Sequence, residues 1–413
     1  MYLRGSKWNM TRRTRKPSNP LFLLLLIAAI GGLYYIGRVY LPKVSVNVPF
    51  ISTPTATRSP ESFLNEAEAL TAEGKISQAV EAYEQAIISD PTNPATYISL
   101  ARVQLLAGLY QEALKNADNA LLLNPNNAMA LTVKAWALNY MEDYLGAEAT
   151  IAQALELDAN NALAYAVNAE ILLDQGNYED IETAIAMSRK AQELAPNALE
   201  THRIRGYVLF YTANYEDALA EYQAAIALND KLWDLHYSLG AIYKAIGEYD
   251  LAVQEMLAAV ALNPTNPDIL TEISRTYAAV GQFGKAIQYA EQALSLDPSS
   301  PRLHGNLGVM LYKSDEYSRA ADELALAVQG GMTADGTPVQ GLPLAPGRIA
   351  DDYYSIYALS LTNLDRCAQA VPIMQLILSN IADDQVAYYN AVQGMEYCRQ
   401  AVVTATPTTE AAP

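Results

Sequence analysis

An internal repeat of 34 residues constrains the fold of this chain more than any other feature. An aromatic residue returns along the chain with successive spacings of 34, 34, 37, 34, 34 and 34 residues. These aromatic residues are Tyr110, Tyr144, Tyr178, Tyr215, Tyr249, Phe283 and Tyr317. Self-similarity at this period is typical of helix–turn–helix solenoids.

The residues between the aromatic positions predict two helices in each unit. Apolar residues three and four apart, such as Leu235, Leu239 and Ile242, form one apolar stripe on a helix. The Asn-Pro at Pro264 then ends the second helix. Because one helix pair cannot bury its stripes alone, neighbouring pairs must stack. The sequence therefore predicts an all-α array.

The repeated positions resemble those of the tetratricopeptide repeat family. In one unit they are Leu239, Gly240, Tyr243, Gly247, Tyr249, Ala252, Ala259 and Pro264. The resemblance implies a right-handed superhelical solenoid of helix pairs, and protein–protein scaffolding rather than catalysis. It covers residues 60–329 as about eight units. A divergent unit and a capping helix follow within 349–400, and the fourth unit carries extra residues around Glu179–Thr183, which predict a longer turn.

The charge is unevenly distributed along the 413 residues, whose formal net charge is −18. Residues 1–60 contain nine basic residues and no acidic one, whereas 18 basic and 45 acidic residues follow. A repeat region this acidic repels nucleic acid, so we expect no nucleic-acid partner.

The N-terminus predicts a membrane anchor. Residues 1–20 are basic and 21–41 are mostly apolar, long enough as a helix to span a bilayer. The basic cluster places residues 1–20 in the cytoplasm and the repeats outside it, as in a single-pass protein of the cytoplasmic membrane. A cleaved signal peptide is the alternative, although no small-residue cleavage site follows the apolar run.

Three further segments flank the repeats. Residues 42–59 are rich in Pro, Ser and Thr and predict a stalk, and Ser59 with Pro60 predicts a helix start. Residues 330–348 form a Gly/Pro-rich loop that we expect to fold onto the array through its apolar side chains. Residues 401–413 predict a disordered tail.

No motif in the sequence predicts catalysis, a cofactor or a metal site. Phosphate-binding, serine-hydrolase and zinc-protease motifs are absent. The three histidines, His202, His236 and His304, occupy the same packing position of their repeats. Equivalent positions of neighbouring repeats are about 10 Å apart. We therefore expect a protein that is not an enzyme.

The two cysteines predict a disulfide. Cys367 begins the second helix of the divergent unit, and Cys398 ends the capping helix. Antiparallel packing of these helices brings the two sulfurs together, and an extracytoplasmic location permits the bond. The alternative is a pair of buried thiols.

The resemblance also implies that the first helix of each unit lines a concave face. The side chains expected there are aromatic and cationic, as interfaces favour. The predicted binding groove comprises Arg102, Trp136, Tyr140, Arg203, Tyr207, Phe210, Tyr211, Tyr237, Lys244 and Arg275. The alternative is that these side chains only pack between neighbouring first helices.

These observations predict a non-catalytic, membrane-anchored scaffold or adaptor that binds partner proteins or peptides through its concave face. Two alternatives stay open: an assembly factor or receptor facing the cytoplasm, and a module that stacks glycans or envelope polymers on its aromatic residues. If the groove is open, replacing Trp136, Tyr207 and Tyr211 by Ala abolishes partner capture with little effect on the melting temperature.

Overall fold

The computed structural model describes residues 20–39 and 58–405. The chain divides into two units, one up to Thr57 and one from Arg58. In the first unit, helix α1 spans Pro20–Val39. None of the helices in the described ranges combines the length and apolarity that crossing a membrane requires. The predicted anchor over 21–41 is thus not supported, and residues 1–19 and 40–57 lie outside the described residues.

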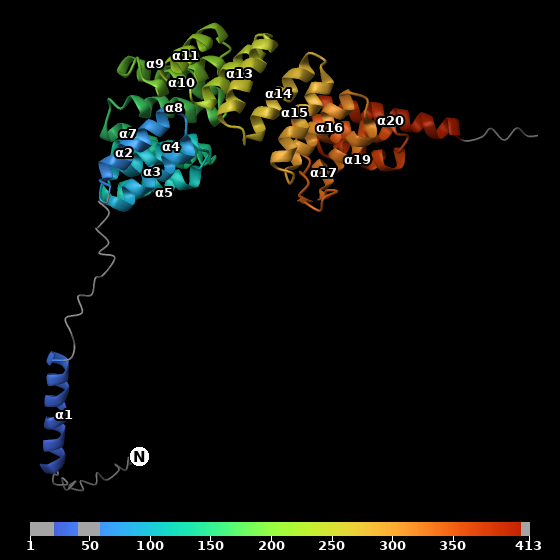
Figure 1. Ribbon diagram of the computed structural model, residues 1–413. Helices are drawn as coiled ribbons and strands as arrows, with labels where there is room; N and C mark the ends of the chain where they lie inside the picture. The colour runs from blue at the N-terminus through green and yellow to red at the C-terminus, as the bar shows by residue number, and fades with distance from the viewer. Residues whose placement is uncertain (1–19, 40–57, 406–413) are drawn as a thin grey trace, which may run out of the picture. The chain divides into compact units, whose positions relative to one another are not determined.

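The second unit is an array of antiparallel helix pairs (Figure 1). The array begins where predicted: the Ser59 side chain accepts a hydrogen bond from the Ser62 amide, and Pro60 opens the first helix. The first helices of the eight pairs are α2 (Pro60–Ala72), α4 (Pro94–Leu106), α6 (Ala128–Tyr140), α8 (Ala162–Asp174), α10 (Leu199–Tyr211), α12 (Trp233–Ala245), α14 (Pro267–Ala279) and α16 (Pro301–Lys313). The second helices are α3 (Ile76–Ser89), α5 (Tyr110–Leu123), α7 (Tyr144–Leu157), α9 (Ile181–Leu194), α11 (Tyr215–Leu228), α13 (Tyr249–Leu262), α15 (Phe283–Leu296) and α17 (Tyr317–Gln329).

The repeated aromatic residue marks the start of the second helix in six of these pairs. The fourth pair differs, because Tyr178–Asp180 form a 3₁₀ turn before α9 begins at Ile181. The three residues that lengthen this repeat therefore form the longer turn that the sequence predicts.

Most first helices contact the first helix of a neighbouring pair. Helix α6 touches both α4 and α8, and α8 touches α10. In a curved stack, the helices on the inner side come closest together. The first helices therefore line the inner face of the array, as the resemblance implies.

The curvature brings the start of the array against its fifth pair. Gly74, in the turn between α2 and α3, lies so close to Lys231 that a Cβ atom would be 2.5 Å from the Lys231 carbonyl oxygen. Ile76 and Leu106 pack against the same apolar cluster as Leu232. On the inner face, Arg102 of α4 forms an ion pair with Glu200 of α10. Residues 60–232 thus close on themselves, which the sequence analysis did not anticipate.

The segment after α17 folds onto the array. Strands β1 (Gly331–Met332) and β2 (Pro338–Val339) pair antiparallel, and Val339 is buried. Leu342 and Leu344 pack against the C-terminal apolar cluster, so the loop is ordered through the side chains expected to anchor it.

The last elements complete a divergent pair and its cap. A π-helix over Ile349–Tyr354 continues into α18 (Ser355–Asn363), which packs against α19 (Cys367–Asn380). Helix α20 (Gln385–Ala405) covers both. Because α20 continues to Ala405, residues 401–405 are helical rather than disordered as expected, and residues 406–413 lie outside the described part of the chain.

Candidate protein-binding surface

The inner face of the first five pairs is organised around Arg203 of α10. Its Nε donates a hydrogen bond to Asp234 Oδ2 over 2.8 Å, and its Nη2 donates to the Tyr140 hydroxyl over 2.6 Å. Nη2 also lies 3.6 Å from Glu170 Oε1, which accepts a hydrogen bond from Tyr140. The guanidinium sits 5.3 Å from the centre of the Trp136 ring. Arg203 therefore joins four neighbouring first helices through charge and stacking.

This buried network shifts the protonation equilibria of its members. Burial raises the pKa of Glu170, although the Arg203 charge acts in the opposite direction. Burial also raises the pKa of Tyr140 far above its usual range. Tyr140 therefore stays a neutral hydroxyl, able to donate to Glu170 while accepting from Arg203.

A second group of contacts links α6, α8 and α10 beside it. The Tyr207 hydroxyl donates to Asp174 Oδ1, and Asn139 Nδ2 donates to Asp174 Oδ2, each over 2.6 Å. Asn139 is 2% exposed. Both oxygens of this carboxylate are thus used inside the array.

A cavity of about 210 Å³ lies between α4, α6 and α10. Its walls include Arg102, Trp136, Glu200 and Arg203. Trp136 is 4% exposed, so its ring is almost wholly enclosed. Because the Arg102–Glu200 ion pair spans this cavity, the inner face here is partly filled by the protein's own side chains.

The remaining predicted aromatic residues have different surroundings. The ring centres of Phe210 and Tyr215 are 5.9 Å apart, and those of Tyr237 and Trp233 are 6.3 Å apart. Tyr211 is 41% exposed, and its ring touches that of Tyr207 edge-on. Among the predicted aromatic residues, Tyr211 is thus the most accessible.

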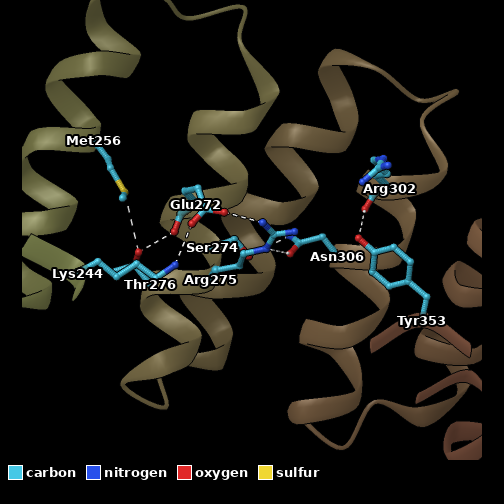
Figure 2. A network of polar contacts seen from close by, with 9 residues as sticks. All are labelled: Lys244, Met256, Glu272, Ser274, Arg275, Thr276, Arg302, Asn306 and Tyr353. Carbon is cyan, nitrogen blue, oxygen red and sulfur yellow. Dashed lines mark hydrogen bonds and ion pairs between the residues drawn. The ribbon is translucent and has the colours of Figure 1, made fainter. Parts of the chain in front are cut away.

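The two predicted cations further along the array share one carboxylate (Figure 2). Lys244 Nζ lies 2.8 Å from Glu272 Oε2, and Arg275 Nη1 lies 2.5 Å from Glu272 Oε1. Arg275 Nε also donates to Asn306 Oδ1. The two cations lower the pKa of Glu272 against the opposing effect of burial, so this carboxylate stays ionised.

The structure separates the ten predicted groove residues into four sets. Four of them form or adjoin the buried contacts around Arg203 and Asp174, namely Trp136, Tyr140, Arg203 and Tyr207. Lys244 and Arg275 form the Glu272 cluster, and Arg102 pairs across the cavity. Phe210, Tyr211 and Tyr237 belong to neither polar cluster. Their contacts with a partner protein stay predictions.

The expected effect of the triple alanine substitution changes with this geometry. Removing Trp136 from a site where it is 4% exposed costs about 3–5 kcal/mol of folding free energy. Such a variant would unfold more readily whether or not it had lost a partner, so it does not separate binding from packing.

A regular contact of the histidines escaped the sequence analysis. Nδ1 of His202, His236 and His304 faces a glutamate 19 residues later, Glu221, Glu255 and Glu323, at 2.6, 2.7 and 2.6 Å. Nε2 of His304 faces the Pro298 carbonyl oxygen at 3.0 Å. Since both partners of His304 accept hydrogen bonds, the doubly protonated ring fits best. Burial lowers its pKa, but these bonds outweigh burial and raise it. The constant His-to-Glu spacing was the available signal.

The predicted disulfide is present. Cys367, at the start of α19, is bonded to Cys398, which lies within α20 rather than at its end as expected. It joins the last helix pair to its cap, as the antiparallel packing of these helices requires.

Comparisons with known proteins identify the repeats. Tetratricopeptide repeat models match residues 70–137, 234–266 and 271–335, and a further model described as a TPR repeat matches 206–247. No curated protein matches the chain.

Solved structures resemble parts of the array. A chain of the APC/C hetero-tetramer Cut9–Hcn1 matches 60% of this chain with 17% identity and a TM-score of 0.46, and this chain covers 55% of that one. The type IV pilus biogenesis factor PilW matches 48% of this chain and 90% of its own, with 23% identity and a TM-score of 0.44. MamA matches 35% of this chain and 85% of its own, with 23% identity and a TM-score of 0.33. From the four family matches and its helix pairs, the chain is an all-α solenoid that contains tetratricopeptide repeats.

Proposed function

We propose that this protein is a non-catalytic scaffold or adaptor that binds partner proteins through the inner face of its repeat array. The observation that supports this most directly is that contacting first helices carry aromatic and cationic side chains, among them the exposed Tyr211. Side chains of these kinds dominate the energetics of protein interfaces. The helix-pair scaffold holds them in fixed positions, which reduces the ordering cost of binding.

Photo-crosslinking in intact cells tests this function. Tyr211 on α10 and Tyr178 in the 3₁₀ turn are each replaced by p-benzoyl-phenylalanine in the full chain. Both positions are exposed tyrosines, at 41% and 86%, so the substitution is matched in size and chemistry. We expect Tyr211 to give a discrete protein adduct that Tyr178 does not give. Absence of any adduct at Tyr211, or the same adducts at both positions, would contradict the proposal.

The location is a second part of the proposal. We place the repeats outside the cytoplasm, held at the cytoplasmic membrane by the apolar N-terminal segment. The Cys367–Cys398 disulfide supports an oxidising compartment, where such bonds persist. The basic residues that precede the apolar segment support the same orientation.

Trypsin treatment of intact spheroplasts tests the location. Lys43 and Arg58 precede the repeats, so brief digestion is expected to release a folded repeat fragment into the medium. Protection of the chain until the cells are lysed would reverse the orientation and favour a cytoplasmic assembly factor.

A further inference from the structure

The cavity of about 210 Å³ exists because the N-terminal region of the array closes on itself. Its lining comes from α2, α3 and α4 of the first two pairs, from α6, and from α10 with the turn that follows α11. The first pair and the fifth pair are far apart in sequence and meet through Gly74 and Lys231. An open array with the same repeats would therefore not enclose this space.

Two apolar clusters supply much of the wall of this cavity. Leu106, Leu199 and Leu232 belong to the cluster that joins the start of the array to its fifth pair. Tyr83 and Val103 belong to the cluster of the first two pairs, and each is 4% exposed. An apolar group that enters the cavity leaves water for side chains that are already ordered, which favours binding.

Three charged side chains are among the described residues that line the cavity, and one of them is already paired elsewhere. Arg203 pairs with Asp234 at 2.8 Å and lies 3.6 Å from Glu170. The other two, Arg102 and Glu200, pair only with each other within residues 58–405. The charges that remain for a ligand are thus one positive and one negative, from opposite sides of the cavity.

The Arg102–Glu200 ion pair can open for a ligand that carries both charges. The two side chains are 41% and 26% exposed, and an ion pair this exposed contributes little to stability because water screens it. A ligand with a single charge would leave the other side chain without a partner beside an apolar wall. A ligand with one cation and one anion gives each side chain a new partner, so the charges stay balanced.

We propose that this cavity, named here the 102–200 pocket after the ion pair that spans it, binds a free amino acid with an apolar side chain. Arg102 donates hydrogen bonds to the carboxylate, and Glu200 accepts them from the ammonium group. The wall of Leu106, Leu199 and Leu232 receives the apolar side chain. The volume lies below the roughly 300–1,000 Å³ of pockets for drug-sized molecules, which suits so small a ligand. The pocket does not depend on the proposed scaffold function.

Equilibrium dialysis of the purified full-length protein with radiolabelled L-leucine tests the proposal. Two competitors each lack one charge: isocaproate has no ammonium group, and isoamylamine has no carboxylate. We expect L-leucine to bind with a dissociation constant below about 1 mM. Isocaproate and isoamylamine are expected to compete about tenfold or more less well than unlabelled L-leucine, because each leaves one side chain of the pair without a partner.

Single substitutions locate the site. Arg102→Gln and Glu200→Gln each remove one charge from a partly exposed side chain, so both variants are expected to fold. Each is expected to weaken L-leucine binding about tenfold or more. The matched control is Arg319→Gln, which removes partly exposed ion pairs with Glu291 and Glu316 at the last pair of the array. It is expected to change the affinity less than about twofold.

Three results would overturn the proposal. The first is no binding of L-leucine up to about 1 mM, the weak limit of specific recognition. The second is competition by isocaproate or isoamylamine as strong as that by L-leucine, because one of the two charges would then not be recognised. The third is full affinity in Arg102→Gln or Glu200→Gln, or an equal loss in Arg319→Gln, which would place the ligand elsewhere.

Discussion

The two ends of the array use equivalent side chains differently. Arg102 and Arg275 are both the ninth residue of their first helices, α4 and α14. Arg102 reaches across the inner face to Glu200, three pairs away, and closes a cavity. Arg275 pairs with Glu272 on its own helix and lines a cavity of about 230 Å³ together with Lys313 and Arg348, which form no ion pair within residues 58–405. The same repeat position thus forms a long-range ion pair in the N-terminal region and a pair within one helix in the C-terminal region.

The difference follows from which elements supply the charges on the inner face of each region. In residues 60–232 the partners of the inner-face charges come from other first helices. In the C-terminal half the segment that follows the array adds one cation, Arg348, and one acid, Asp352, to a cavity lined by Lys244, Arg275 and Lys313, so it does not reduce the excess of cations there. We therefore expect substitutions of the inner-face charges in residues 60–232 to change stability more than substitutions of the exposed Lys313 or Arg348.

The largest expected effect is at Arg203. Arg203→Ala leaves the buried Glu170 without its cation, which costs about 3–5 kcal/mol. Arg102→Ala removes a partly exposed pair and costs about 1 kcal/mol or less. Urea denaturation of both variants measures the difference. Similar small losses would show that the Arg203 network does not stabilise the N-terminal region.

Loss of the disulfide acts on the opposite end. Replacing both Cys367 and Cys398 by Ser removes a crosslink over 31 residues, worth roughly 3–4 kcal/mol in the chain-entropy picture. Hydrogen exchange is expected to accelerate in α19 and α20 and to stay unchanged in α4 and α6. Faster exchange in the N-terminal helices as well would contradict this separation of the two regions.

A matched glycine pair sharpens the case for closure. Gly74→Ala places a methyl group against the Lys231 carbonyl oxygen at a left-handed φ of +71°, whereas Gly108→Ala has the same strain at +74° with open space around it. We expect the left-handed φ alone to cost each variant about 1–2 kcal/mol of folding free energy. The clash at Gly74 is expected to cost about 1–3 kcal/mol more. Thermal melts of both variants give the difference. Equal losses would indicate that the contact with Lys231 adds no stability.

The smallest expected effect is a pH dependence that arises from Asp351 in the π-helix Ile349–Tyr354. Burial, together with the neighbouring Asp384, raises the pKa of Asp351 to about 6. Because the folded-state pKa lies above the ordinary value, this group stabilises the fold at low pH, and the contribution is lost as the pH rises through about 6. Asp384 has a lowered pKa, because the Gly347 amide donates to it, and holds the insertion to α20.

Protection factors of the Gly347 and Ala387 amides measure this effect. We expect protection to fall between about pH 4 and pH 6 in the wild-type chain and to stay level above that range. Asp351→Asn carries a neutral donor at every pH and is expected to remove the dependence. An unchanged pH response in that variant would assign it to other groups.

Local features of the fold were predictable from the sequence because they repeat. The aromatic positions start the second helices, the spacing of 37 becomes a 3₁₀ turn, and the cysteines bond. Each of these features depends on residues close in sequence or on the packing of one helix against the next.

Features that depend on accumulated curvature were not predictable. A small rotation per pair decides whether Gly74 reaches Lys231, and no local pattern encodes that distance. The candidate groove shows the same limit: its residue types were identifiable, but the pairing of Arg203 with Asp234 and Glu170 depends on how tightly the first helices pack. The His-to-Glu spacing of 19 residues, by contrast, is visible in the sequence.

The contact between Gly74 and Lys231 changes how the array should unfold. An open repeat array behaves as a one-dimensional chain in which terminal repeats melt first and each repeat responds only to its neighbours. Joining the first pair to the fifth makes a ring in that description, because the terminal repeat cannot leave without breaking a contact far along the sequence. Residues 60–232 should therefore unfold as one cooperative unit, with the N-terminal pair protected from fraying.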